Sequence, residues 1–218
     1  MTIFKDRRDA GEKLASKLAR LSKQDGVVFG LARGGVITAL PIAKGLLWPL
    51  RPLVIRKIGH PYFSEYAIGA VTATGDCILN EKETMGMDEA LLKGLVRREE
   101  NEAKRRENLY SKDLPALSLK NKMAVVVDDG VATGLTLKLA IKSVREMKPA
   151  QILVACPVAP AETAEEIYKL VDQATFLEAD QNFLGAVGAH YLSFPQTSDE
   201  EVIQALTKAN QKINDFPK

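Results

Sequence analysis

Two adjacent acids, Asp128 and Asp129, follow a run of β-branched residues and precede a turn of glycine, alanine and threonine. This order predicts a buried strand, a tight loop at 130–134 and a helix that starts after it. Backbone N–H groups at the partly positive N-terminus of a helix favour an anion such as phosphate. Ionised carboxylates only accept hydrogen bonds, so they suit the hydroxyls of a sugar beside that phosphate. The stretch therefore predicts a site for a ribose phosphate.

Two other stretches combine backbone access with positive charge. The turn at 32–35 contains Arg33 and two glycines, and glycine lets the main chain approach a ligand closely. Arg56 and Lys57 end a predicted strand at 51–57, near the crevice where open α/β sheets bind ligands. An ordinary turn with a solvated arginine, or a solvated strand end, would also explain either stretch.

These stretches together resemble the signature of the type I phosphoribosyltransferases, which bind 5-phosphoribosyl 1-diphosphate, and in particular a bacterial and archaeal branch whose substrate is usually unassigned. The resemblance covers nearly the whole chain. It implies that Asp128 and Asp129 are catalytic, holding the ribose hydroxyls and placing negative charge near a cation-like transition state. It further implies a 5-phosphate loop of Gly130, Val131, Ala132, Thr133, Gly134 and Thr136. The diphosphate-binding residues would be Ala32, Arg33, Gly34, Gly35, Arg56 and Lys57, with a peptide bond in the 32–35 turn that is often strained in the family.

The reaction implied by the resemblance is transfer of ribose 5-phosphate to a nitrogen of a base or related acceptor, with inversion at the anomeric carbon and release of diphosphate. Mg²⁺ would arrive with the donor and keep most of its water, so no direct protein ligand is expected. The alternative is a regulatory module on the same fold that binds phosphoribosyl diphosphate or a nucleotide without turnover. No side chain stands out as a reader of the acceptor base.

The amino-acid composition limits which classes of protein this chain can belong to. Hydrophobic residues make up 46% of the 218 residues and charged residues 27%, which is typical of a soluble globular protein and fits one α/β domain over 1–218. A net charge of only +2 argues against a nucleic-acid partner. Cys77 and Cys156 lack disulfide or metal spacing, and no apolar run is long enough to span a membrane. We expect a cytoplasmic protein without a membrane partner, and a possible homodimer.

Alternating helices and strands predict a central, mostly parallel sheet flanked by helices. The expected helices cover 6–22, 36–47, 137–147 and 161–171, and the expected strands cover 27–31, 51–57, 125–127, 151–155 and 174–178. Residues 156–160 are expected as a loop and 65–79 as a hairpin. Pro41 either kinks its helix or delays the first turn of that helix.

Three further segments complete the expected fold. Charged residues of both signs at 80–112 predict a solvated helix, preceded at 80–87 by the segment that would correspond to a mobile lid in the resembled family. Glu65 resembles a feature of the same branch with no readable role. The tail resembles the hood that recognises the acceptor, with elements from both termini including 180–195. Phe183, His190 and Tyr191 are either base contacts there or core residues. Ser198 and Glu201 form a capping-box pattern at the start of the last helix.

Overall fold

The computed structural model describes residues 3–63, 66–181 and 183–214, with side chains described up to residue 211. Its centre is a five-stranded sheet in the order β2-β1-β6-β7-β8, and all four strand pairs are parallel. The strands are β1 (Gly26–Leu31), β2 (Leu50–Leu53), β6 (Met123–Val127), β7 (Gln151–Pro160) and β8 (Gln173–Asp180). The expected parallel sheet is therefore confirmed.

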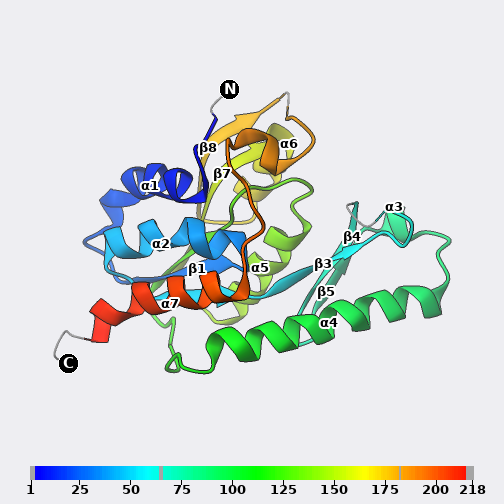
Figure 1. Cartoon of the computed structure of the whole chain (residues 1–218), viewed down its shortest axis with the longest axis horizontal. Coiled ribbons are helices and arrows are strands. Elements are labelled where there is room, and N and C mark those ends of the chain that lie inside the picture. The colour runs from blue at the N-terminus through cyan, green and yellow to red at the C-terminus, as the bar shows by residue number, and fades with distance from the viewer. Residues whose placement is uncertain (1–2, 64–65, 182, 215–218) are drawn as a thin grey trace.

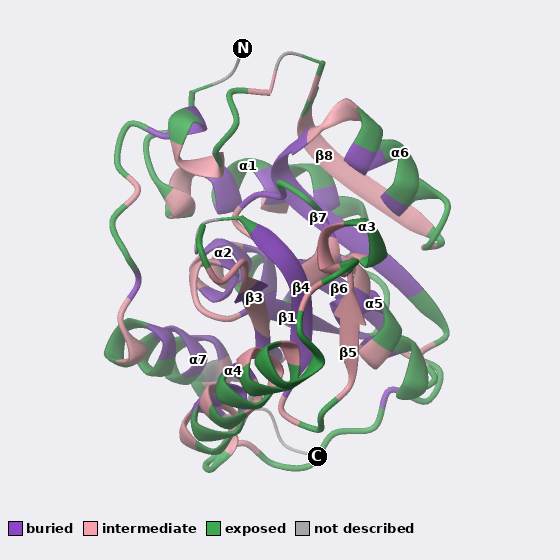
Figure 2. Cartoon of the chain, turned by 90° about the vertical axis from the view of Figure 1, so that its right-hand side faces the viewer, coloured by how far each residue is buried: buried purple, intermediate pink, exposed green. Residues whose placement is uncertain are grey.

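Helices cover both faces of this sheet (Figure 1). Because side chains alternate along a strand, Val125 faces a core shared with α1, α2 and α7, whereas Val126 faces a core shared with α5 and α6. Figure 2 shows that the buried residues concentrate in the strands and on the helix faces turned toward them. The helices are α1 (Arg7–Leu18), α2 (Gly34–Leu46), α5 (Leu135–Glu146), α6 (Ala161–Tyr168) and α7 (Asp199–Asn214), with short 3-10 turns at Ala19–Leu21 and Val187–His190. No helix in the described ranges is long and apolar enough to cross a membrane.

A second, antiparallel sheet extends to one side of the main sheet (Figure 1). It consists of β3 (Ile55–Gly59), β4 (Ala67–Thr72) and β5 (Cys77–Leu79), followed by α3 (Glu81–Thr84) and the long α4 (Glu89–Ser111). Its own small core joins residues such as Ile58 and Ile68 to Leu95 and Val96 of α4. The predicted hairpin at 65–79 is confirmed over β4 and β5, while Glu65 lies outside the described residues.

The prediction of one strand at 51–57 is wrong. β2 pairs with β1 only as far as Leu53, and β3 begins at Ile55 with a different partner, β4. Both halves favour extended structure, but a hydrogen-bonding partner from another part of the chain decides which sheet each half joins. Arg56 and Lys57 consequently lie within an antiparallel strand that begins two residues after β2 ends, and not at the end of a parallel strand.

Three smaller predictions can also be compared with the structure. Residues 156–160 continue strand β7, because they pair with β8 as far as Pro160 and Asp180. Helix α2 starts at Gly34 and contains Pro41, so this proline does not delay the first turn. The capping box is confirmed, since the Ser198 N–H donates to Oε2 of Glu201 at 2.7 Å and the Glu201 N–H donates to Oγ of Ser198 at 3.2 Å.

Candidate functional site

The predicted site lies where the strand order of the main sheet reverses. From β1 the chain passes to β2 on one side and later returns to β6 on the other, and Gly30 of β1 is in register with Val127 of β6. Ligands of open α/β sheets bind outside the carboxyl ends of strands at such a reversal. The turn at 32–35 leaves β1 at this point, and Asp128 and Asp129 leave β6 beside it.

The turn and the acid pair are in direct contact. A Cβ atom on Gly34 would lie 1.9 Å from Oδ2 of Asp129, closer than any real contact allows. Only glycine therefore permits the turn to approach the acids this closely. The peptide bond between Ala32 and Arg33 is cis, and the Ala32 N–H donates to the carbonyl of Leu53 at 2.9 Å. The structure thus brings together two of the stretches that the sequence singled out.

The loop after the acids leads into the N-terminus of α5. Gly134 is the N-cap residue of this helix and has φ 75°, a left-handed conformation that glycine adopts without strain. The hydroxyl of Thr163 donates to the carbonyl of Ala132 at 3.1 Å and holds the loop against α6. Ala132 and Thr133 are exposed and Thr136 is half-buried, so the loop presents main-chain and hydroxyl groups at an accessible helix N-terminus.

The two acids are adjacent in the chain and both are half-buried. The Asp129 N–H donates to Oδ1 of Asp128 at 2.8 Å. Asp128 keeps partial solvent contact, yet the surrounding protein desolvates its carboxyl group and raises its pKa well above the usual range; the charge of Asp129 raises the pKa further. The positive charge of Arg7 acts in the opposite direction. Two adjacent carboxylates in this position thus form an acceptor pair whose charge is costly to bury.

Arg7 is a site residue that the sequence did not reveal. Its Nε donates to Oδ2 of Asp129 at 2.6 Å, and its side chain is only 11% exposed. In the sequence Arg7 is one of several charged residues in an amphipathic N-terminal helix. No local pattern marks it, because its partner lies 122 positions later in the chain.

Segments near both ends of the chain join to form a cap beside Asp129, which we call the hood (residues 3–6 and 183–195). Phe4 and Tyr191 form a parallel bridge, and the Leu192 N–H donates to the carbonyl of Phe4 at 2.8 Å. The hydroxyl of Tyr191 donates to the carbonyl of Asp129 at 2.5 Å. Burial, and then the charge of Asp129, raise the pKa of Tyr191 above its ordinary value, so it remains a hydrogen-bond donor.

The aromatic residues of the hood are mainly core residues. His190 is fully buried and stacks on Phe183 with ring centroids 5.1 Å apart, and Tyr191 is 7% exposed. Phe183 is half-buried. Of the three residues considered as base contacts, Phe183 alone therefore retains substantial access to solvent.

Two of the predicted cations, Arg33 and Arg56, have acidic partners. Arg33 lies 3.7 Å from Asp199 of α7. Arg56 donates through Nε and Nη2 to the same Oε2 atom of Glu99 in α4, at 3.0 and 2.7 Å. Arg56 and Lys57 are successive residues of β3, so their side chains leave the strand in different directions. Both residues line a cavity of about 470 Å³ beside α4, together with His60.

The expected lid segment faces the phosphate loop across a cavity. The N-cap of α3 is Asn80, whose Oδ1 accepts from the Lys82 N–H at 3.2 Å. A space of about 520 Å³ is lined on one side by residues 79–82 and on the other by Thr133, Lys138 and residues of α6. The segment that would correspond to a lid in the family is thus adjacent to the loop.

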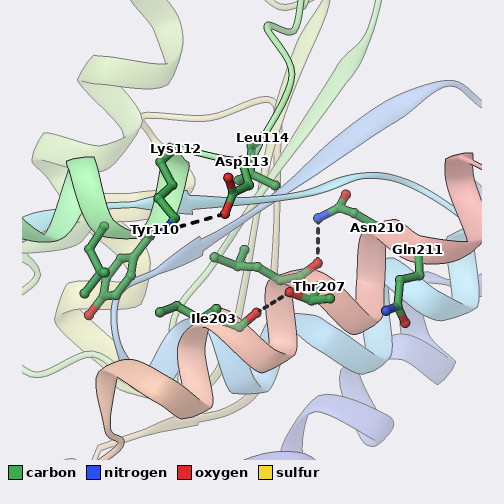
Figure 3. A pocket seen from close by; sticks show the side chains of 10 residues that line it. Tyr110, Lys112, Asp113, Leu114, Ile203, Thr207, Asn210 and Gln211 are labelled. Atoms are coloured by element: carbon green, nitrogen blue, oxygen red, sulfur yellow. Dashed lines mark hydrogen bonds and ion pairs between the residues drawn. The ribbon is translucent and has the colours of Figure 1, made fainter.

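A separate cavity of about 280 Å³ lies between the end of α4 and α7 (Figure 3). Tyr110, Leu114 and Ile203 are among its lining residues, and no residue of the predicted site lines it. Within the part of the chain that the structure describes, no group of three or more His, Cys, Asp or Glu side chains could hold a metal ion.

Comparison with known proteins connects this geometry to a family. A family model described as phosphoribosyl transferase domain matches residues 3–193. Two curated proteins from strains of Mycobacterium tuberculosis, named "Putative phosphoribosyl transferase" MT0597 and Rv0571c, are each 38% identical over 213 residues. The alignment covers 97% of this chain and 48% of each relative, so the chain spans about half the length of these proteins.

A solved structure, TT1426 from Thermus thermophilus, is 36% identical with a TM-score of 0.76 and covers 95% of this chain and 99% of its own. The two comparisons agree over almost all of the residues that form the sheet, the loop and the hood. The chain therefore belongs to the phosphoribosyl transferase domain family, and its central parallel sheet flanked by helices is the type I phosphoribosyltransferase fold.

Proposed function

We propose that this chain transfers ribose 5-phosphate from 5-phosphoribosyl 1-diphosphate to a nitrogen of a base or related acceptor, with release of diphosphate. One observation carries the proposal. The acid pair Asp128–Asp129 lies between two elements that we assign to phosphate groups, the 130–134 loop that follows it and the 32–35 turn that contacts it through Gly34. A sugar with phosphate groups on both sides matches this order of phosphate, hydroxyl and phosphate sites.

The 5-phosphate would bind the loop. Residues Gly130 to Gly134 and Thr136 lead into a helix of 12 residues, whose N-terminal N–H groups and dipole favour an anion. The exposed hydroxyl of Thr133 and the half-buried hydroxyl of Thr136 supply further donors.

The ribose hydroxyls would bind the acids. Each hydroxyl can donate to a carboxylate oxygen, and the negative charge of Asp129 and Asp128 would stabilise the positive charge that develops on the ring as diphosphate leaves. Fixed charges in a partly desolvated site act more strongly than they would in water. Desolvation raises the pKa of Asp128 and so disfavours its charged form, whereas the positive charge of Arg7 acts in the opposite direction.

The leaving diphosphate would bind at the Ala32–Gly35 turn, where Ala32, Arg33 and Gly34 are half-buried and Gly35 is buried against β6. Arg33, which is 20% exposed at this turn, would contribute a forked guanidinium. We assign further positive charge to Arg56 and Lys57; Arg56 would share its guanidinium with Glu99.

Mg²⁺ would accompany the donor. Mg²⁺ prefers hard oxygen ligands and keeps several waters when it binds substrate phosphates, so we assign it no direct protein ligand. When bound, it would neutralise part of the charge of the diphosphate. Asp128 and Asp129 are the residues of this chain that could contact its water shell.

Acceptor selection would fall to the hood, in which Phe183 and Phe194 are the half-buried aromatic residues. Residues 80–87 would close over the loop and exclude water, which matters because water competes with the acceptor for a cation-like intermediate.

The test is calorimetric titration with 5-phosphoribosyl 1-diphosphate and Mg²⁺, followed by a panel of purines, pyrimidines and other heterocycles with diphosphate release as the readout. The Asp128→Asn/Asp129→Asn variant should bind the donor at least about tenfold more weakly, since each lost charge-assisted bond contributes about 1.5–3 kcal/mol.

The matched control is Asp25→Asn/Asp113→Asn, which removes the same charge from side chains that are 69% and 85% exposed. Its donor affinity should equal that of the wild-type chain. Unchanged affinity in the Asp128/Asp129 variant would exclude the ribose assignment. Tight donor binding without diphosphate release from any acceptor would favour the non-catalytic module instead.

A further inference from the structure

Arg7 contacts both the acid pair and the hood. Its Nε donates to Oδ2 of Asp129 at 2.6 Å, and its Nη1 donates to the carbonyl of Pro195 at 2.6 Å. Its guanidinium lies 3.7 Å from the centroid of the Phe194 ring. The side chain is 11% exposed, and that of Asp129 is 16% exposed.

The Arg7 guanidinium makes its two hydrogen bonds through N–H groups at its edge and contacts the Phe194 ring with its flat face. Guanidinium presents several N–H donors in fixed directions and a flat face that stacks on aromatic rings. Because two directions are bound by the hood and α1 places the stem, the orientation of the Nε–H toward Asp129 is set before any ligand arrives. The Asp129 main chain is also held, since its carbonyl accepts from Tyr191.

Charge explains why such a partner is needed. Asp128 and Asp129 are adjacent and lie close enough for the charge of one to raise the pKa of the other, whereas Arg7 offsets that repulsion. A carboxylate has two oxygens and about four acceptor positions, so an Arg7 bond at Oδ2 leaves capacity for a hydroxyl.

We propose that Arg7 is a positioning residue that orients the Asp129 carboxylate toward the ribose hydroxyls of the donor. This inference rests on the function proposed above and deepens it. It makes the N-terminal helix part of the donor site, and it couples the acids to the hood through Pro195 and Phe194.

The experiment compares Arg7→Gln, Arg7→Lys and the control Arg8→Gln by calorimetry with 5-phosphoribosyl 1-diphosphate and Mg²⁺, and separately with inorganic phosphate. Arg8 is the neighbouring residue, its side chain is 78% exposed, and it pairs with Glu12 of its own helix. Arg7→Gln should weaken donor binding about tenfold or more, and Arg8→Gln should leave it unchanged.

The affinity for inorganic phosphate distinguishes a loss of positioning at Asp129 from general damage to the donor site. Phosphate would occupy the 130–134 loop without contacting Asp129, so its affinity should stay within about twofold in Arg7→Gln. Arg7→Lys keeps the charge but lacks the fork, and it should fall between wild type and Arg7→Gln. If Arg7→Gln does not fold, the same comparison is made with Arg7→Lys.

A double-mutant cycle with Asp129→Asn adds a second readout. If Arg7 acts through Asp129, Arg7→Gln should weaken donor binding by less than about twofold in the Asp129→Asn background. Additive losses would overturn the inference, as would equal donor binding by wild type and the folded Arg7 variants, or parallel losses for donor and inorganic phosphate. Failure of the wild-type chain to bind the donor would overturn the proposed function, and the inference with it.

Discussion

The guanidinium of Arg33 lies 3.7 Å from the carboxylate of Asp199, so the first turn of α7 contacts the turn that opens α2. Asp199 also accepts from Tyr110 at 2.5 Å and from Arg105 at 2.8 Å, both of which belong to α4. One carboxylate therefore connects three elements that meet beside the predicted diphosphate-binding turn.

Replacing this carboxylate should destabilise the fold. Burial alone would raise the pKa of Asp199, but the bonds from Tyr110 and Arg105 outweigh it and lower the pKa. Asp199→Asn should reduce the free energy of unfolding in urea by about 1 kcal/mol at pH 7. A carboxyl whose pKa is lowered on folding stabilises above its unfolded pKa and loses that effect as pH falls through the folded value, so the difference should shrink below about pH 4.

Glu200→Gln is the matched control for Asp199→Asn, because Glu200 occupies the same first turn of α7 but is exposed. Its effect should be smaller than that of Asp199→Asn. Equal losses in the two variants would mean that helix-end charge, and not the contact with α4 and Arg33, accounts for the effect.

Asp128 should show the opposite pH dependence. Its pKa is raised on folding, mainly by desolvation and then by the charge of Asp129, so the folded state binds more protons than the unfolded state above about pH 4. Its contribution to stability therefore falls as pH rises from that value through the folded pKa. Asp128→Asn should raise the Tm by about 2–4 °C at pH 7, and the gain should vanish below about pH 4. A gain that persists at low pH would contradict the electrostatic cause.

Gly34 should tolerate no larger side chain. A Cβ there would lie 1.9 Å from Oδ2 of Asp129 and 2.7 Å from Nε of Arg7, so Gly34→Ala must displace the acid or the turn. We expect a loss of about 2–3 kcal/mol in the free energy of unfolding, together with weaker donor binding.

Gly45 provides a control in the same helix, since its Cβ would meet only Cβ of Ala15, at 3.9 Å. Gly45→Ala should stabilise the protein by about 0.5–1 kcal/mol, because alanine loses less backbone entropy in a helix. A comparable loss in both variants, measured by urea unfolding, would show that the contact with Asp129 is not the cause.

Arg33 and Arg56 should differ in their effects on donor binding. Arg33→Gln should weaken the binding of 5-phosphoribosyl 1-diphosphate about tenfold, because Arg33 lies on the turn that contacts the acid pair. Arg56→Gln should weaken binding less and destabilise the fold more, because it removes a two-bond partner from Glu99, which is 8% exposed. Calorimetry measures the donor affinity of both variants, and urea unfolding measures their stability. If Arg56→Gln weakened donor binding more than Arg33→Gln, the diphosphate would lie nearer β3.

Local sequence determined a large part of the site. The strand, loop and helix around Asp128 and Asp129 follow from β-branched residues, a glycine-rich turn and a helical pattern, and the structure has them at β6 and α5. The capping box at Ser198 and Glu201 is equally local. These features depend on residues a few positions apart, so their patterns could be recognised in the chain alone.

Only the tertiary structure decided which distant residues meet. The sequence predicts one strand over residues 51–57. In the structure the first half pairs with β1 and the second half pairs with β4, so the two halves belong to different sheets. The Arg7–Asp129 pair and the Arg56–Glu99 pair are likewise absent from any local pattern. Hydrogen-bond partners and buried charge pairs are selected by the packing of the whole chain, whereas the phosphate loop needs only its own backbone and the helix that follows it.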